Sequence, residues 1–435
     1  MSIRGHGGGG GSGRPGRAGR RRRLSLTALL TDTLKRMLLL VGGLQLGVIL
    51  TLIGVDAWRK RVKPRSAQFP HSEPTSTAIG TSNVTTYTYG ENLYAAMLAA
   101  IRGARERIMF ETFIWKADRI GQEFKDELVR AAERGVEVYV VLDAFANLVV
   151  PSGFKRFPPS LHVLEYPVFP PGWRFYDLRR TGRDHRKILV VDGEIGFVGG
   201  YNIGAMYATQ WRDTHVRIEG SSVWDLQNAF IDFWNLRRGP ELPALDDPGT
   251  TQWESRIRVH RNVPRSWLFP IRGMYLEAFD RAQHHIYLTQ AYFIPDEDFL
   301  ASLLAAARRG VDVRVLVPEV SNHVVADWLS RGFYSPLLRG GVRLMLYQNA
   351  MVHAKTATID GQWTTVGTAN IDRISLTGNY EVNVEFYDSD LAKQMQQIFE
   401  TDCSNARELT LPAWERRHLV AKFSEAVLAP LRPLL

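Results

Sequence analysis

The chain has 435 residues, of which 45% are hydrophobic and 11% are aromatic, so it can bury a large core. Its single cysteine, Cys403, excludes an intrachain disulfide framework and a cysteine-based zinc site. The net charge of +9 is uneven: residues 1–65 carry +12, which leaves −3 for residues 66–435. A nearly neutral folded part argues against a nucleic-acid enzyme, which places its positive charge on the domain that binds phosphates.

The N-terminal region is predicted to attach the chain to a membrane. Residues 1–36 are rich in Gly and Arg and are expected to be disordered. Residues 37–57 are predicted to form one transmembrane helix, because "MLLLVGGLQLGVILTLIGV" has no charged residue and approaches the roughly 30 Å hydrocarbon thickness. A buried core helix and a cleaved signal peptide are the alternatives. A small excess of Lys and Arg before the helix favours an internal N-terminus, with the folded part outside.

Beyond a basic juxtamembrane segment and linker, predicted for residues 58–84, the chain repeats one order of elements. Residues 93–115 suggest a helix and a strand, followed by the helix "FKDELVRAAERG" and the strand "VEVYVVLD". Residues 274–318 repeat this order, ending in "FLASLLAAARRG" and "VDVRVLVP". Strands alternating with such helices predict an α/β fold. We expect two similar halves, 85–250 and 251–402, whose mixed sheets are flanked by helices and packed about a pseudo-twofold axis.

Residues 403–435 mix Leu, Val and Phe with basic residues, which predicts a C-terminal helix. This helix would either lie on a bilayer surface or dock on the core.

Each predicted half contains one polar motif with the same spacing. "HRKILVVDGEIGFVGGYN" occupies residues 185–202, and "HAKTATIDGQWTTVGTAN" occupies residues 353–370. Residues two apart in a strand share a face, so each histidine should lie beside the lysine that follows it. The aligned pairs are His185 and His353, Lys187 and Lys355, Asp192 and Asp360, Gly199-Gly200 and Gly367-Thr368, and Asn202 and Asn370.

The remaining motif positions have separate expected roles. The two Asp-Gly pairs predict hairpin turns between apolar strands. The small residues Gly199, Gly200, Gly367 and Thr368 would let the backbone approach a bound phosphate, and Asn202 and Asn370 would donate hydrogen bonds to it. An acid also stands 28 residues after each histidine, Asp213 after His185 and Glu381 after His353. A carboxylate behind an imidazole fixes its tautomer and stabilises its cation, so each half offers a histidine with a candidate orienting acid.

Two histidines, two lysines and two asparagines suit a reaction at a phosphodiester. One neutral histidine would attack phosphorus and form a phosphohistidine. The other would protonate the departing alcohol and later deprotonate the incoming alcohol or water, a contribution of about 10²–10⁴-fold. Lysines and asparagines would bind the non-bridging oxygens. This scheme requires no cofactor, and the sequence contains no recognisable metal-ligand cluster, so activity is expected to survive a chelator.

The paired motifs resemble the HKD motifs of the phospholipase D superfamily, and the resemblance covers about residues 85–435. Within it the chain resembles bacterial cardiolipin synthases, on "RDHRKILVVDGEIGFVGGYNI", "WRDTHVRIEG", "LTQAYFIPD" and "VHAKTATIDGQWTTVGTANIDRISLTGNYEVN". The resemblance implies a membrane enzyme that transfers a phosphatidyl group from histidine to an alcohol, with two phosphatidylglycerols yielding cardiolipin and glycerol. It implies a catalytic set of His185, Lys187, Asp192, His353, Lys355 and Asp360, with His185 as the nucleophile.

Two features depart from that pattern. Such synthases often carry two N-terminal hydrophobic segments, whereas one is evident here. Asn322, in "PEVSNH", replaces an acid expected in a loop near the entrance, which bears on the choice of acceptor.

Three alternatives remain open from the sequence. A phospholipase D hydrolase of the same fold would use water as the acceptor and release phosphatidic acid. A nuclease of the superfamily is disfavoured by the nearly neutral folded part. A non-catalytic scaffold would require degenerate motifs, and both motifs are intact.

Overall fold

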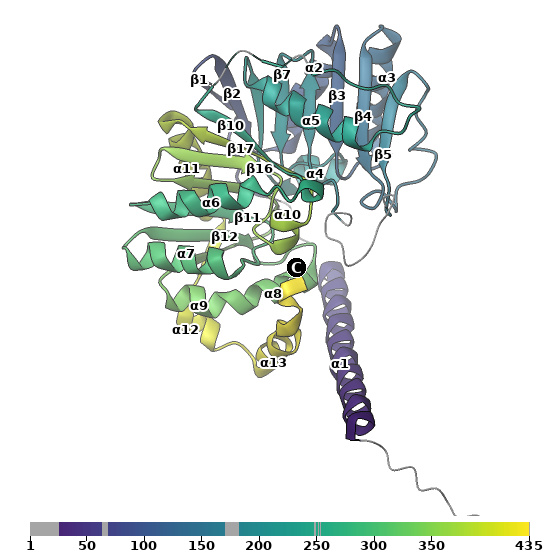
Figure 1. Ribbon diagram of the computed structural model, residues 1–435. Helices are drawn as coiled ribbons and strands as arrows, with labels where there is room; N and C mark the ends of the chain where they lie inside the picture. Colours follow the sequence, from purple (N-terminus) through teal and green to yellow (C-terminus); the bar gives the residue numbers. More distant parts are fainter. Residues whose placement is uncertain are drawn as a thin grey trace, which may run out of the picture. The chain divides into compact units, whose positions relative to one another are not determined.

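The computed structural model describes residues 26–62, 68–169, 182–247, 249–250, 252 and 254–434 (Figure 1). The first element is the long helix α1, Leu26–Val62. Its segment Leu30–Arg59 is long and apolar enough to cross a membrane, and apolar side chains such as Leu39 and Leu40 are exposed along it. The predicted disorder is therefore wrong for residues 26–36, whose leucines extend the helix, while residues 1–25 lie outside the described part.

The first sheet begins inside the segment that was expected to be a linker. Residues Thr75–Ile79 form strand β1 and residues Ser82–Tyr87 form strand β2, joined by a turn in which Gly80 has φ 57°. Ile79 and Val84 are fully buried, so this hairpin contributes to the core. The linker prediction is wrong for this stretch, because its polar and β-branched residues pair as strands at the edge of a sheet.

Two eight-stranded mixed sheets organise the folded part, as predicted. The first has the order β1-β2-β9-β7-β6-β3-β4-β5, which adds β3 (Arg107–Thr112), β4 (Glu137–Asp143), β5 (Leu161–Tyr166), β6 (Ile188–Val191), β7 (Ile195–Gly199) and β9 (His215–Glu219). The second has the order β10-β17-β16-β15-β11-β12-β13-β18, comprising β10 (Ile257–Asn262), β11 (His285–Gln290), β12 (Asp312–Pro318), β13 (Arg343–Tyr347), β15 (Lys355–Ile359), β16 (Trp363–Gly367), β17 (Glu381–Tyr387) and β18 (Ala406–Leu409).

The two sheets repeat one topology. The strands β3, β4 and β5 are parallel, as are β11, β12 and β13, and the remaining neighbours are antiparallel. The predicted strands 136–143 and 311–318 correspond to β4 and β12. Each histidine motif runs into a hairpin, β6–β7 or β15–β16. In each half, the motif histidine comes just before a strand that runs antiparallel to the parallel strands. It therefore lies at the edge of the sheet where the parallel strands have their C-terminal ends.

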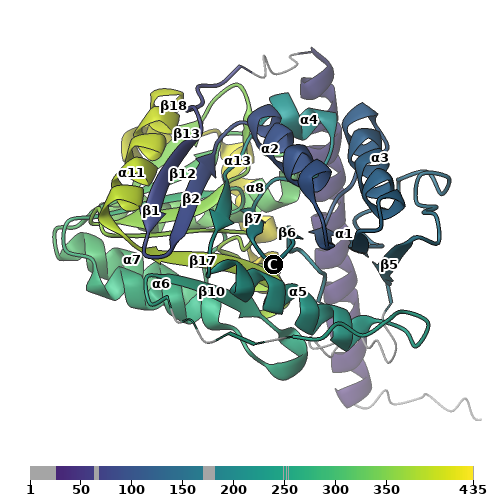
Figure 2. The same ribbon diagram turned by 90° about the horizontal axis from the view of Figure 1, so that it is seen from above.

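Helices cover both sheets (Figures 1 and 2). The larger ones are α2 (Gly90–Gly103), α3 (Arg119–Glu133), α5 (Val223–Arg237), α6 (Pro270–Arg281), α7 (Glu297–Arg308) and α11 (Ser389–Ser404). α2 and α3 share a core with one face of the first sheet, and α6 and α7 share one with the second. A third core joins α5, α11 and strands of both sheets, so the halves are packed together through their inner faces.

The C-terminal residues do not form the single helix expected for residues 403–435. Strand β18 pairs with β13 and extends the second sheet beyond residue 402. The short helices α12 (Leu411–Glu415) and α13 (Leu419–Leu428) follow it. Trp414 is buried, and its Nε1 donates to Ser335 Oγ at 2.8 Å. The tail therefore docks on the core, while part of α13 remains exposed.

Candidate active site

Backbone hydrogen bonds place both motif histidines at the seam between the halves. Strand β8 (Trp211–Arg212) pairs in parallel with β14 (Met351–Val352) of the other half. The amide of His353 donates to the carbonyl of Arg212 at 2.7 Å. In the equivalent contact, the amide of His185 donates to the carbonyl of Tyr380 at 3.0 Å. Paired strand β6 begins only at Ile188, so the segment containing His185 bonds across the seam instead of within its own sheet.

The orienting acids also cross the seam. His353 Nδ1 lies 2.6 Å from Oδ2 of Asp213, and His185 Nδ1 lies 3.0 Å from Oε2 of Glu381. The predicted acids therefore contact histidines, but the pairing within each half is wrong. Asp213 follows Arg212, and Glu381 follows Tyr380, so each acid comes directly after the residue whose carbonyl binds the histidine of the other half. The backbone hydrogen bond between the halves therefore places the carboxylate next to that histidine.

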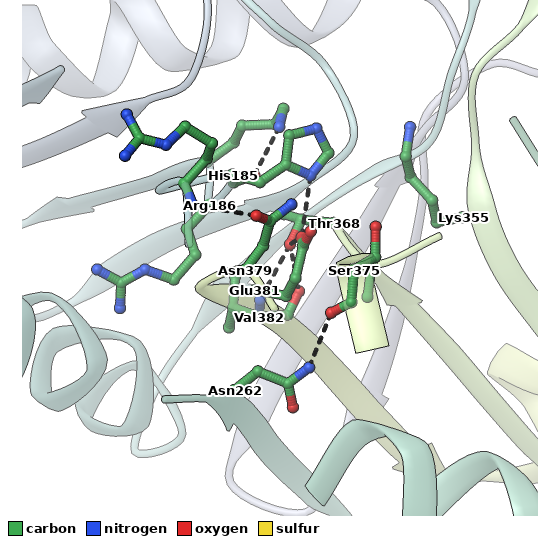
Figure 3. A network of polar contacts seen from close by, with 12 residues as sticks. His185, Arg186, Asn262, Lys355, Thr368, Ser375, Asn379, Glu381 and Val382 are labelled. Carbon is green, nitrogen blue, oxygen red and sulfur yellow. Dashed lines mark hydrogen bonds and ion pairs between the residues drawn. The ribbon is translucent and has the colours of Figure 1, made fainter. Parts of the chain in front are cut away.

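The motif lysines lie in the same site. Lys187 Nζ donates to the carbonyl of His185 at 2.7 Å, and Lys355 Nζ lies 2.9 and 3.0 Å from the two ring nitrogens of His353. Figure 3 shows the His185 imidazole directed at Glu381, with the Lys355 side chain beside them. Each lysine also acts electrostatically on the histidine of the other half. The four side chains thus form one centre.

Burial and charge set the protonation of these groups. Burial, followed by the two lysine charges, holds the pKa of His185 well below its ordinary range. Burial and Lys355 lower the pKa of His353 to about 3. Burial also lowers the pKa of Lys187 to about 8 and that of Lys355 to about 7. Both imidazoles are therefore neutral at pH 7 before a substrate binds, and the ammonium groups are close to titration.

The two orienting acids differ in charge. Burial opposes ionisation of Asp213, but the contacts with His353 and Lys355 outweigh it and lower the pKa to about 2. Burial raises the pKa of Glu381 to about 8, because the lysine charges and the hydroxyl of Thr368 only partly offset it. Asp213 is thus a carboxylate at neutral pH, whereas Glu381 favours its neutral form. The two halves are similar in geometry but not in electrostatics.

Small residues at the ends of β7 and β16 make room for neighbouring protein atoms. A Cβ atom at Gly200 would lie 2.1 Å from Oδ1 of Asp213, and one at Gly199 would lie 2.4 Å from the carbonyl of Thr214. A Cβ atom at Gly367 would lie 2.2 Å from Oδ1 of Asn383. Close approach of a neighbouring segment therefore accounts for these glycines, and their contact with a phosphate stays a prediction.

Thr368 stands where the first half has Gly200, and the two positions differ in function. The Thr368 hydroxyl donates to Oε2 of Glu381 at 2.6 Å, which is the oxygen that contacts His185. Among the described residues no hydroxyl donates to Oδ2 of Asp213, and its Oδ1 accepts from the amide of Thr214 at 2.8 Å. The Thr368 hydroxyl therefore contacts a carboxylate, and its contact with a phosphate stays a prediction.

The two asparagines are buried and have different surroundings. Asn202 Oδ1 accepts from the amide of Ile114 at 3.2 Å, and its carbonyl accepts from the hydroxyl of Tyr94. The Oδ1 atom of Asn370 has no hydrogen-bond partner among the described residues. A buried amide oxygen without a partner is costly, so Asn370 fits a role toward a bound molecule better than Asn202 does.

The two aspartates of the motifs lie at the hairpin turns, away from the histidines. Asp192 Oδ1 and Oδ2 accept from the amides of Arg105, Glu106 and Arg107 at 2.8–2.9 Å. Asp360 makes the equivalent three bonds, to residues 283–285, at 2.8–2.9 Å. Both aspartates have φ 54°, which Asp tolerates at a turn. They fix the start of β3 and β11 and contact no group of the histidine centre, so these contacts favour the turn role over the catalytic one.

A buried ionic cluster around Arg186, the residue after His185, was not predicted from the sequence. Arg186 NH2 contacts Oε1 of Glu111 at 2.5 Å, and its Nε contacts Oδ1 of Asp184 at 3.1 Å. The equivalent motif position in the second half is Ala354. The sequence difference between "HRK" and "HAK" is the signal that could have revealed this asymmetry.

The loop around Asn322 lies close to His353, in agreement with the expected place near the entrance. Tyr292 donates its hydroxyl to Oδ1 of Asn322 at 2.6 Å, and its ring centroid is 6.3 Å from that of His353. No group of three or more His, Cys, Asp or Glu side chains in the described ranges is placed to hold a metal ion.

Comparisons with known proteins agree with this geometry. The family model described as "Cardiolipin synthase, PLD-like domain" matches residues 97–234 and 275–403, which include both motifs and both orienting acids. A cardiolipin synthase from Staphylococcus aureus strain Mu50 is 35% identical over 360 residues, covering 80% of this chain and 73% of the relative. One from Clostridium perfringens strain SM101 is 29% identical over 375 residues, covering 83% and 78%.

A solved structure supports the fold. The phosphatidylserine synthase of Haemophilus influenzae superposes with a TM-score of 0.63 over 83% of this chain and 94% of its own, at 15% sequence identity. At that identity the likeness concerns the arrangement of the two halves alone. With the family model and the relatives matched over most of its length, the chain belongs to the cardiolipin synthase family of phospholipase D-like proteins.

Proposed function

We propose that the protein is a membrane phosphatidyltransferase that forms cardiolipin and glycerol from two phosphatidylglycerol molecules. The observation that carries this proposal is the crossed pairing, in which each histidine is held by a carboxylate of the other half. This pairing assembles two imidazoles and two lysines into one centre, as a double displacement at phosphorus requires. The relatives named cardiolipin synthase support the choice of lipid.

In the first step, Nε2 of His185 attacks the phosphorus of the donor lipid. The bond from phosphorus to the glycerol headgroup oxygen breaks. His353 gives that oxygen a proton, which it takes up from solvent when the bound phosphate anion offsets the lysine charges that lower its pKa. In the second step, His353 takes the proton from a hydroxyl of the acceptor phosphatidylglycerol. The resulting oxygen forms a bond to phosphorus while the bond to nitrogen breaks, which restores neutral His185.

The difference between the two acids supports this assignment of roles. The general acid must carry an extra proton, and an ionised carboxylate 2.6 Å from His353 stabilises that imidazolium. Glu381 binds His185 at 3.0 Å and shares the same oxygen with the hydroxyl of Thr368, so it stabilises a cation less well. His185 is therefore better suited to remain neutral and attack.

Lys187 and Lys355 are assigned to the non-bridging oxygens of the phosphate, with Asn370 as an additional polar contact. Lys187 Nζ contacts the carbonyl of His185, and Lys355 Nζ contacts the ring of His353, so both ammonium groups bring positive charge to the two histidines. Positive charge fixed in advance at this place stabilises the transition state more than the ground state. Asp192 and Asp360 are assigned to support of the fold.

Helix α1 is assigned as the membrane anchor, spanning once. The most apolar 18-residue window of its segment Leu30–Arg59 has a mean hydropathy of 2.4, and a lipid-modifying enzyme gains access to its substrate when it is held at a bilayer. The excess of Lys and Arg before the helix favours a folded part on the outer side.

The test is a product analysis with the full chain purified in detergent and supplied with vesicles of phosphatidylglycerol. Cardiolipin and released glycerol are the expected products, and mass spectrometry of rapidly quenched protein should find the phosphatidyl group on His185. Either His185→Ala or His353→Ala should abolish turnover while circular dichroism stays unchanged. Phosphatidic acid as the sole product would establish the hydrolase instead.

A further inference from the structure

The loop after β4 exposes large apolar side chains. Phe145 is 52% exposed, Leu148 60% and Val149 82%. Such side chains within five residues are unusual on a soluble surface, and a contiguous apolar patch marks a site of interaction. The position of this loop, next to the histidine centre, indicates what kind of partner it binds.

The loop lies beside the histidine centre. It begins after Asp143, whose Oδ2 accepts from the amide of Asp184, the residue before His185, at 3.1 Å. Within the loop, Asn147 donates to the carbonyl of Phe113 at 2.8 Å, and the Phe113 ring centroid is 4.6 Å from that of His185. The loop that carries the exposed side chains therefore lies next to the segment of the proposed nucleophile.

The second half repeats this feature across the pseudo-twofold axis. Val320, which is 39% exposed, stands two residues after the end of β12, as Phe145 stands two residues after the end of β4. The same loop continues to Asn322, which is bound to Tyr292 beside His353. We call Phe145, Leu148, Val149 and Val320 the apolar rim, since they flank the centre from both halves.

Helix α13 continues the apolar surface on the side of Val320. It packs against α8 (Val324–Ser330), which follows the β12 loop directly. Its side chains Leu419, Val420 and Phe423 are 81%, 75% and 54% exposed. Arg416, which caps α12, and Lys422 of α13 are exposed in the same stretch, and exposed apolar side chains with basic neighbours are typical of segments that bind the surface of anionic bilayers.

We propose that the apolar rim and the exposed face of α13 form a docking surface that inserts into an anionic phospholipid bilayer around the mouth of the site. The inference rests on the proposed function, because a phospholipid must pass from its bilayer to a buried histidine. A rim that enters the headgroup region allows the lipid phosphate to reach the centre while its acyl chains stay in apolar surroundings. Arg416 and Lys422 complement the charge of phosphatidylglycerol.

The test measures the depth of a spin label, independently of turnover. The full chain with Cys403→Ala carries a nitroxide at Val149→Cys and is reconstituted in phosphatidylglycerol vesicles. The matched control is Tyr387→Cys, another exposed large side chain, which lies beside Asp360 at the opposite ends of the strands. The label at 149 should be relaxed more by oxygen, which concentrates in the bilayer, than by an aqueous nickel chelate, and the label at 387 should show the reverse.

Equal accessibility of both labels to the nickel chelate would overturn the docking surface. Dipolar broadening between labels at 149, without the preference for oxygen, would assign the rim to contact with a second copy and would also overturn it.

A second measurement uses the double variant Leu148→Ser, Val149→Ser. Its rate on phosphatidylglycerol vesicles should fall roughly tenfold, because two apolar side chains no longer enter the bilayer. Its rate on dispersed short-chain phosphatidylglycerol should equal that of the unaltered chain, and equal losses on both substrates would contradict the proposal. Failure of the proposed function is distinguishable: labels that insert in a chain that forms no cardiolipin would leave the docking surface intact.

Discussion

His353 and Asp213 stand 140 residues apart in the chain, yet their Nδ1 and Oδ2 atoms are 2.6 Å apart across the seam between the halves. The same crossing joins His185 to Glu381 at 3.0 Å. Neither motif histidine is paired with the acid of its own half. The site therefore exists only when the two halves are packed together, which makes activity and the packing of the halves interdependent.

Asp213→Asn should lower kcat for cardiolipin formation by about 10²–10⁴-fold. The amide keeps the shape of the side chain but cannot stabilise the protonated form of His353. The rate is measured on phosphatidylglycerol vesicles, and formation of the phosphatidyl-histidine is measured separately after rapid quenching. A rate close to that of the unaltered chain would show that the crossed pair does not take part in proton transfer.

Thr368→Val should shift the basic limb of the kcat/KM profile upward by about one pH unit, the worth of one hydrogen bond, because the proposed mechanism uses neutral Glu381. The Thr368 hydroxyl lowers the pKa of Glu381, so its loss raises that pKa further, and Glu381 then ionises only at higher pH. Thr368→Ser keeps the hydroxyl and serves as the control. An unshifted limb in the valine variant would mean that ionisation of Glu381 does not control the reaction.

Asp192→Asn should lower the free energy of unfolding by about 1–3 kcal/mol with little change in kcat. The amide group cannot accept all three backbone hydrogen bonds that the carboxylate accepts. Thermal unfolding and the rate on vesicles are measured in parallel, with Asp360→Asn expected to behave alike. A collapse of kcat at unchanged stability would return these aspartates to the catalytic set.

Sulfate should bind less tightly as the pH rises through 7 to 8. Burial lowers the pKa of Lys355 to about 7 and that of Lys187 to about 8, so each ammonium is present below its pKa and is lost above it. Sulfate keeps its charge over this range, and its affinity should fall by roughly tenfold for each unit above the lysine pKa. Calorimetric titration at several pH values gives the profile. Lys355→Met removes one of the two charges and should bind sulfate weakly throughout, whereas a flat profile in the unaltered chain would exclude the lysines as the anion site.

A chelator should leave the rate of cardiolipin formation unchanged. The charge of the phosphate oxygens is met by Lys187 and Lys355, and the protons are moved by imidazoles. The rate is measured before and after treatment with EDTA, and again after divalent cations are restored. A loss of rate that magnesium or calcium reverses would assign a metal to the reaction.

Much of the fold could be predicted from local patterns. The repeated helix and strand patterns predicted β4 and β12, and the repeated motif predicted the two hairpins. These predictions hold because secondary-structure propensity and the spacing of apolar residues act over short stretches of chain. The predictions failed where tertiary pairing decides. Residues 75–84 were predicted to be a linker, but residues 83–87 pair with β9. The tail was predicted to be one helix, but Ala406–Leu409 pair with β13 as a strand.

By itself, the sequence determined which side chains are available and that the motif residues and their acids occur twice with the same spacing, because residue types and spacings are fixed by the covalent chain. Only the tertiary structure decided which acid serves which histidine. A spacing of 28 residues is equal in both halves, so it pairs Asp213 with either imidazole equally well. The packing of two sheets face to face, which brings Arg212 to His353 and Tyr380 to His185, selects the crossed arrangement.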